Sequence, residues 1–337
     1  MRKNNKGTLQ KVLSFPAFGT TMTLILFIVI ALIFAPALFS LGKIVNLLKS
    51  NLVYAFVAYG VFFVLLSGGV DLSTGAIMSL ACNVTAYIQL HNQEVHAPFW
   101  LMILVSVAIG CVCGMLNGFL VGVIKIQPML ATLGTQYIFF CVSYKINSSM
   151  IFGNMIYKEA PQLLSHLALG VPRFIWLLLV FAALIWAFLR YTKAGRKIYA
   201  VGSNAGSAKL AGINVSTTKV YAYMICGMMC GLAGFLYVCN FNVGDFNVAS
   251  DYAMRAMSIG VLAGASPSGG KGNAVGLVVS VVLISFISYF TNLLPSINLW
   301  SDAIYSFLVL VALFLCYLTD RAHERRDLKE KEGIING

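Results

Sequence analysis

The chain has 337 residues, of which 59% are apolar and only 10% are charged, whereas soluble globular domains carry about 25% charged residues. These proportions exclude a disordered chain, a coiled coil and an ordinary soluble enzyme. Lysine and arginine outnumber aspartate and glutamate by 23 to 11, which gives a net charge of +12. In so apolar a chain, this excess indicates the cytoplasmic loops of a membrane protein rather than a nucleic-acid surface.

Apolar runs long enough to cross a bilayer, about 20 residues each, recur along the chain. Ten spans are predicted, at 22–39, 52–67, 73–90, 99–122, 129–149, 173–190, 219–240, 253–265, 274–292 and 298–318. The first is interpreted as an uncleaved span, although Ala35-Pro36-Ala37 imitates a signal-peptide cleavage site. The eighth is too short to cross alone, which predicts a broken or tilted helix.

Positive charge predicts the orientation of these spans. The segment 190–219 holds six lysines and arginines and no acid, so it is predicted to lie in the cytoplasm. Six spans precede this segment and four follow it, which puts both termini on the same side. We therefore predict an all-α transmembrane helical bundle of about ten spans with cytoplasmic N- and C-termini. Its parts are a cytoplasmic N-terminal segment, 1–21, a transmembrane domain, 22–319, with a cytoplasmic loop, 191–218, and a cytoplasmic tail, 320–337.

The sequence lacks the usual signatures of a nucleotide-binding site, a metal site or an ion-coupling carboxylate. Gly269-Gly270-Lys271-Gly272 is the glycine cluster nearest to a P-loop, but no Ser or Thr follows the lysine, so no ATP site of that type is predicted. The eight cysteines lie in apolar runs without partners at zinc spacing, which predicts no metal site. Most acids lie in connectors, in the tail or at span ends, which disfavours a carrier driven by titrating carboxylates.

The loop 200–213 carries the pattern of a short helix. Asn204 is a good N-cap, small residues follow it, and Gly212 suits the C-terminal end of a helix. A helix of about two turns is far too short to cross lipid. It is interpreted either as a stiff connector or as a docking element that fits a cleft on a partner protein.

This loop resembles the cytoplasmic coupling loop of bacterial ABC-transporter permeases of the ribose/xylose/autoinducer-2 class, which is related to branched-chain amino-acid permeases. The family pattern there is approximately A-V-G-G-N-x-x-A-A-x-L-x-G-I, and Ser207 replaces the first alanine of its pair. The resemblance implies that the matching residues couple the chain to an ATPase. They are Gly202, Asn204, Ala208, Leu210, Gly212 and Ile213.

Three further stretches extend the resemblance, in the family's order, over about 50–315. The stretch from Gly68 to Gly75 is similar to G-G-I-D-L-S-x-G. A second run resembles N-G…K-I-x-P-F-I-A-T-L-G, and it comprises Asn117-Gly118, Lys125-Ile126-Gln127-Pro128 and Ala131-Thr132-Leu133-Gly134. The stretch from Gly264 to Gly272 is similar to G-T-S-x-x-G-G-x-G.

From the residues alone, these motifs are interpreted as structural. Asp71 or Ser73 can cap the helix that begins there. Asn117 lies within an apolar span, where an interhelical hydrogen bond is favoured over a ligand contact. The remaining motif residues permit turns or separate helices, at Gly68, Gly69, Pro128, Gly269, Gly270 and Gly272.

The resemblance implies a permease subunit of an ATP-driven importer in the bacterial inner membrane. It implies a second permease subunit, cytoplasmic ATPase subunits that hold ATP and Mg²⁺, and an extracytoplasmic solute-binding protein, with no cofactor in this chain. One departure stands at the eighth span, where Ala253 and Arg255 replace the glutamate and aspartate that the family often has. This departure indicates that the chain is one half of a heterodimer, although a homodimer stays open. On a helix, Asp251 is placed to pair with Arg255.

A sugar or sugar-like solute is the predicted cargo, because neutral hydroxyl-rich solutes suit weak polar groups and aromatic faces. Five side chains of that type are candidates for the pathway, with helix packing as the alternative role. They are Asn83, Thr85, Gln136, Tyr137 and Tyr144. Two other functions are left open: an ion-coupled secondary carrier or facilitator, and an ABC permease for nucleosides or amino acids. A membrane enzyme is disfavoured, because no His, Asp or Glu residues cluster inside the spans.

Overall fold

The computed structural model describes residues 18–34, 36–91, 98–152, 167–168, 171–248, 252–292, 303, 306–307, 309–311 and 314. These residues are almost entirely helical, which confirms the all-α class. The strands among them are two short antiparallel pairs, β1 (Ile151–Phe152) with β4 (Val243–Gly244) and β2 (Leu167–Ala168) with β3 (Val171–Pro172). The N-terminal segment, the tenth predicted span and the tail lie almost wholly outside the described residues.

The chain divides into two compact units, of which the larger comprises 48–260 and 265–272. Its helices are α4 (Leu52–Leu66), α5 (Thr74–His91), α6 (Phe99–Gly118), the π-helix η2 (Phe119–Val123), α7 (Pro128–Ile146), α9 (Arg173–Tyr191), α10 (Lys193–Ser203), α11 (Ala205–Leu210), α12 (Val215–Phe241) and most of α13 (Tyr252–Leu262). The smaller unit holds α2 (Phe18–Phe34), η1 (Pro36–Phe39), most of α3 (Leu41–Ser50) and α14 (Ala274–Asn292). In the smaller unit α2 packs against α14, and Phe39 stacks on Phe286 with 5.9 Å between ring centroids.

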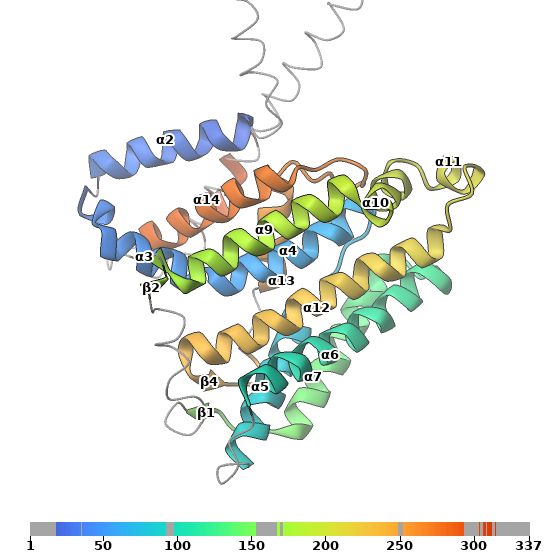
Figure 1. Cartoon of the computed structure of the whole chain (residues 1–337), viewed down its shortest axis with the longest axis horizontal. Coiled ribbons are helices and arrows are strands. Elements are labelled where there is room, and N and C mark those ends of the chain that lie inside the picture. The colour runs from blue at the N-terminus through green and yellow to red at the C-terminus, as the bar shows by residue number, and fades with distance from the viewer. Residues whose placement is uncertain are drawn as a thin grey trace, which may run out of the picture. The chain divides into compact units, whose positions relative to one another are not determined.

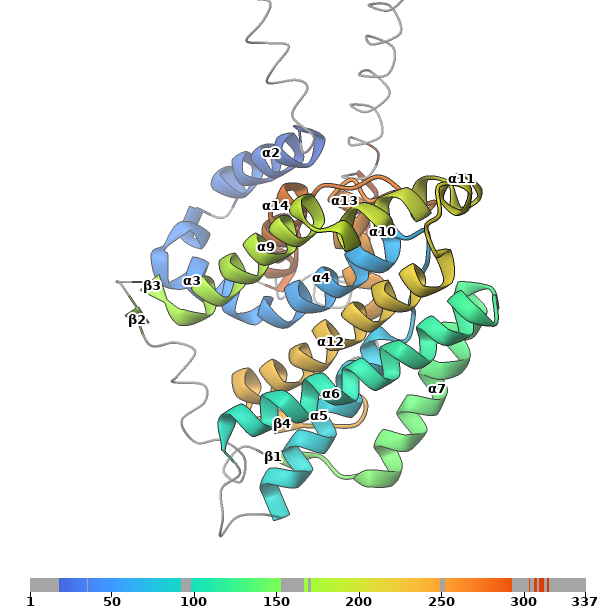
Figure 2. The same cartoon turned by 45° about the vertical axis from the view of Figure 1, so that its right-hand side comes forward.

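Helix α12 forms the centre of the larger unit, where it packs along α6 and also contacts α4 and α5 (Figures 1 and 2). Small residues permit the close approach of α12 to α6. A Cβ at Gly110 or Gly114 on α6 would overlap backbone atoms of α12, and a Cβ at Gly227 or Gly231 on α12 would overlap those of α6. Membrane helices commonly associate through such small residues, because lipid supplies no hydrophobic drive between them.

Three helices of the described chain are long and apolar enough to cross a membrane: Phe99–Val123, Arg173–Tyr191 and Val215–Phe241. The consecutive helices Gly42–Ser50 and Leu52–Leu66 pass the same test as a pair, and Thr20–Val29 and Ala274–Tyr289 are shorter apolar helices. The chain is therefore a helical membrane protein.

Each of the first nine predicted spans contains a helix, and α13 has only 11 residues, which agrees with a segment too short to cross alone. Two helices were not predicted. The first, α3, is a 10-residue helix with two lysines, and the second, α10, lies in the segment expected to hold a single short helix. Both are amphipathic rather than uniformly apolar, so a search for spans overlooks them.

Candidate functional site

The short helix predicted in the loop is present as α11. Its N-terminus is capped by Asn204, whose Oδ1 accepts a hydrogen bond from the N–H of Ser207 at 2.9 Å. At the other end Gly212 has a φ of 77°, and the N–H of Ile213 donates to the carbonyl of Ala208 at 2.9 Å. Ala208 is buried, whereas Leu210 is 92% exposed. The helix therefore presents an apolar side chain to its surroundings from a firmly capped turn.

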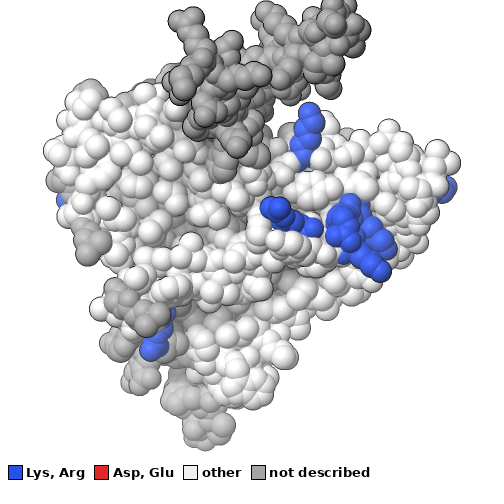
Figure 3. All heavy atoms as spheres, turned by 45° about the horizontal axis from the view of Figure 1, so that its top comes forward, with Lys and Arg blue, Asp and Glu red and all other residues white. Residues whose placement is uncertain are grey.

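Helices α10 and α11 lie at the end of the larger unit opposite the β1–β4 pair (Figure 1). Thr192 caps α10 by accepting from the N–H of Gly195 at 3.0 Å. Figure 3 shows Lys and Arg side chains gathered over the region of α10 and α11, with no Asp or Glu of the described residues on that face. This end of the larger unit is therefore positively charged, as the sequence predicts.

Three of the resembling motifs meet beside α10. Gly202 packs so tightly that a Cβ would overlap the carbonyl of Leu66, and the N–H of Gly270 donates to that same carbonyl at 3.0 Å. A Cβ at Gly269 would lie 2.7 Å from the Cα of Gly68. We call Gly68, Gly202, Gly269 and Gly270 the glycine junction. It joins the turn after α4, the end of α10 and the loop after α13.

The residues of the glycine junction also have an unusual backbone conformation. Gly68, Gly269 and Gly270 have φ values of 75°, 91° and 73°, which other residues rarely adopt. The hydroxyl of Tyr199, on α10, donates to the carbonyl of Gly272 at 2.9 Å. Gly68, Gly269 and Gly270 therefore adopt conformations that suit turns, and they also permit contact between segments that are distant in sequence.

A second meeting of motifs forms a buried polar cluster, comprising Asp71, Ser73, Asn117 and Thr132. The carboxyl Oδ1 of Asp71 accepts from the N–H and the hydroxyl of Ser73, at 2.9 and 2.6 Å. Asn117 Nδ2, on α6, donates to the Ser73 hydroxyl at 2.7 Å, so the buried amide bonds the residue just before α5. Thr132 Oγ1, on α7, accepts from the N–H of Leu72 at 3.2 Å. The cluster ties the turn before α5 to α6 and α7.

Asp71 lies in this turn, outside the candidate spans, and its side chain is fully buried. Burial raises the pKa of the Asp71 carboxyl above its usual range, and the hydrogen bonds from Ser73 and Asn117 oppose that shift. Within the described structure, Asp71 Oδ2, Thr74 Oγ1 and Asn117 Oδ1 are buried without a hydrogen-bond partner. These surroundings favour the neutral carboxyl, because a charged one is costly to bury.

The five candidate pathway residues lie on α5 and α7 and differ in burial. Asn83 is buried and donates to the carbonyls of Ser143 and Asn147 at 2.8 and 2.9 Å, which links α5 to the end of α7. Thr85 is buried and donates to the carbonyl of Ala81 on its own helix at 2.7 Å. On α7, Gln136 is half-buried, and Tyr137 and Tyr144 are exposed.

Arg255 contacts an aromatic side chain of another helix. Its guanidinium lies 5.5 Å from the ring centroid of Tyr54, and that ring stacks on Tyr252 at 3.9 Å. Asp251, the expected partner, lies outside the described residues. Among the described residues, no group of three or more His, Cys, Asp or Glu side chains is placed to hold a metal ion.

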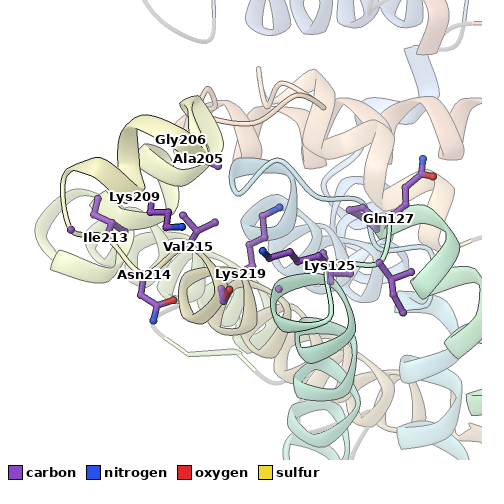
Figure 4. Close-up of a pocket in the computed structure, with 15 residues that line it drawn as sticks. Lys125, Gln127, Ala205, Gly206, Lys209, Ile213, Asn214, Val215 and Lys219 are labelled. Carbon is purple, nitrogen blue, oxygen red and sulfur yellow. The ribbon is translucent and has the colours of Figure 1, made fainter.

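A pocket of about 770 Å³ lies beside α11. It is lined by residues of η2, of the linker 124–127, of α11 and of the start of α12. Figure 4 shows Lys125, Lys209 and Lys219 extending into it from three different elements. Nothing local in the sequence indicates this site, because the three lysines lie in different parts of the chain and only the fold brings them together.

The apolar helices and the capped helix at their charged end define a multi-pass membrane protein. The chain belongs to the family described as the branched-chain amino acid transport system permease component, whose model matches residues 43–313. The family is a membrane component of a transport system and not an enzyme.

Curated relatives are similar over most of their length. The ribose import permease protein RbsC of Haemophilus influenzae is 30% identical over 87% of this chain and 90% of the relative. The protein of the same name from Bacillus subtilis is 29% identical over 92% of this chain and 93% of its own. The galactose/methyl galactoside import permease protein MglC of Escherichia coli is 26% identical over 88% and 93%. No solved structure matches the chain.

Proposed function

We propose that the chain is the membrane-spanning permease subunit of an ATP-driven importer for a sugar or sugar-like solute. Two permease subunits would form the pathway, two ATPase subunits would dock at the α10–α11 end, and a solute-binding protein would deliver the cargo. ATP and Mg²⁺ would be held by the ATPase subunits, and this chain would hold no cofactor. The names of the relatives support the sugar, and the family supports the class of transporter.

The single observation that carries the coupling role is the exposed apolar side chain on α11. Leu210 is 92% exposed on a helix fixed at one end by the Asn204 cap and at the other by the Gly212 turn. An apolar side chain held out in this way gains free energy when a partner covers it. Binding of the ATPase subunits then shifts the equilibrium between the two conformational states of the permease, provided that the ATPase binds the two states with different affinities.

The membrane arrangement in this proposal has ten spans, with both termini and the 191–218 loop in the cytoplasm of a bacterium. The excess of Lys and Arg around α10 and α11 supports the cytoplasmic placement of that end. Six predicted spans before the loop and four after it then bring the termini to the same side.

The pathway lies, in this proposal, along α7, where Tyr137 and Tyr144 are exposed and Gln136 is half-buried. Aromatic faces and amides suit neutral hydroxyl-rich solutes. Asn83 and Thr85 would support the pathway from behind, since both are buried and hydrogen-bonded to helix backbone. An amino-acid cargo is the second candidate, because the family description refers to branched-chain amino acids. Competition of uptake by ribose or galactose, compared with leucine, distinguishes the two cargoes.

The coupling role is tested by Leu210→Asp. We expect loss of ATPase association and of uptake, because a carboxylate cannot be buried in an apolar cleft without a cost of several kcal/mol, roughly a thousandfold in affinity. Co-purification of the ATPase subunit with the full chain measures the association. The purified permease alone is expected to hydrolyse no ATP.

Met150→Asp is the matched control. Met150 is also an exposed apolar residue, and it precedes β1 at the opposite end of the larger unit. The control should insert into membranes and retain the ATPase. Unchanged uptake in Leu210→Asp would contradict the coupling role, and equal loss in both variants would indicate a general defect of insertion.

A further inference from the structure

Three lysines from separate elements converge in the pocket beside α11 (Figure 4). Lys125 belongs to the linker between η2 and α7, Lys209 to α11 and Lys219 to the start of α12. Lys125 and Lys209 are exposed, and Lys219 is half-buried. None of the residues that line the pocket is acidic. The pocket walls therefore concentrate positive potential, which attracts an anion.

The linker that carries Lys125 has an unusual backbone. Lys125 has a φ of 66°, in the left-handed region that residues with a Cβ rarely adopt. It follows the π-helix η2, and the N–H of Ile126 closes the turn by donating to the carbonyl of Leu120 at 3.0 Å. Such costly conformations concentrate at ligand sites. In this linker the conformation accompanies a lysine side chain that extends into the pocket.

The pocket lies where two candidate spans end. Phe99–Val123 ends just before Lys125, and Val215–Phe241 begins just before Lys219. Close packing joins these two ends, since a Cβ at Gly122 would lie 2.7 Å from the carbonyl oxygen of Ser216. A lysine at the end of a span lies at the level of the lipid headgroups, where its ammonium group meets phosphate.

Exposed apolar side chains adjoin the pocket on the side toward α7. Ile126 lines the pocket, and its neighbours Ile124, Met129 and Leu130 are 52%, 50% and 62% exposed. A free inorganic anion gains nothing from such a surface, whereas the acyl chains of a lipid would cover it and gain hydrophobic free energy. The combination of converging lysines with adjoining apolar side chains therefore favours an amphiphilic anion.

We propose that this pocket binds an anionic phospholipid, with its phosphodiester among Lys125, Lys209 and Lys219 and its acyl chains over Ile124, Ile126 and Leu130. Because Lys209 belongs to α11, the bound lipid fixes this helix against η2 and α12. Lipid binding at this pocket requires neither an ATPase subunit nor a cargo, so its test is independent of the proposed transport function.

The test measures lipid retained by the full chain after extraction from vesicles of equimolar phosphatidylglycerol and phosphatidylcholine, by native mass spectrometry. The triple variant Lys125→Gln, Lys209→Gln, Lys219→Gln removes the pocket charges. The control Lys193→Gln, Arg196→Gln, Lys197→Gln removes three charges from exposed positions of α10. We expect phosphatidylglycerol affinity to fall about fivefold for each pocket lysine, on the order of 100-fold in the triple variant, and less than about threefold in the control.

The single variant Lys125→Gln, at an exposed position, should give the fivefold loss if the triple variant does not fold. Equal loss in the triple variant and the control would overturn the site in favour of diffuse electrostatic attraction. Unchanged retention in the pocket variants would overturn it as well, and loss of ATPase association in those variants would then assign the pocket to an acidic segment of that partner. Displacement of the lipid by equimolar glycerol phosphate would assign the pocket to a soluble anion and overturn the lipid.

Discussion

The glycine junction and α11 are adjacent in sequence and opposite in character. Gly202, at the end of α10, lies so close to the backbone of Leu66 and Gly270 that no side chain fits there. Leu210, a few residues later, is 92% exposed. Both match the same stretch of the coupling-loop pattern. The comparison teaches that one motif holds two kinds of residue, those that pack the loop against the helices and those that leave a side chain exposed.

The anchoring residues give the exposed ones a fixed base. The Tyr199 hydroxyl and the backbone of Gly270 tie the region of α10 to the turn after α4 and to the loop after α13. The proposed coupling role therefore predicts that a movement of α11 reaches helices α4 and α13, because these backbones are in contact without intervening side chains.

The largest expected effect comes from filling the glycine junction. Gly202→Val would force the backbones of α10 and the turn after α4 apart, which costs upwards of 3 kcal/mol because overpacking here meets backbone atoms. We expect little monodisperse protein in detergent size-exclusion chromatography and a much lower melting temperature. Gly134→Ala on α7 is the matched control, since a Cβ there meets nothing within 4 Å. Equal behaviour of the two variants would contradict the junction.

A smaller effect is expected in the buried polar cluster. Because burial raises the pKa of Asp71, the folded chain binds its proton more tightly than the unfolded chain. The stability that Asp71 contributes is therefore fully present below its pKa in the unfolded chain, about 4. It is lost as the pH rises through the raised pKa of Asp71 in the folded chain. Asp71→Asn should remove this loss, which a series of melting temperatures against pH measures.

Asp71→Ala provides the comparison for that series. It removes the acceptor of the Ser73 N–H and hydroxyl, so we expect destabilisation of about 1–3 kcal/mol at all pH values. If Asp71→Asn destabilised the chain as much as Asp71→Ala, and the pH dependence persisted, the interpretation that Asp71 is neutral in the folded chain would be wrong.

Local signals in the sequence were sufficient for some features. Asn204 and Gly212 predicted α11, because capping and helix termination depend on neighbouring residues. Asn117 was expected to bond another helix, because a buried amide in an apolar span needs a partner, and it bonds Ser73. Long apolar runs predicted the larger helices for the same reason, since they depend on composition within one window.

Long-range features could not be predicted in this way. Nothing local to Gly68, Gly202 or Gly269 indicates that they meet, although each was expected at a turn or in the coupling loop. Arg255 contacts Tyr54 on α4, a partner that the neighbours of Arg255 in the sequence do not indicate. In both cases the partner is set by how the helices pack, which a single sequence does not specify.

The central claim is that α11 is the docking element, presented on the cytoplasmic side. Its most direct test is a cysteine at Leu210, labelled with a membrane-impermeant maleimide, with the unmodified chain and its native cysteines as the background. The account predicts labelling in inverted membrane vesicles and none in intact cells, with protection when the ATPase subunits are bound. Labelling of this position from the outside of intact cells would contradict it.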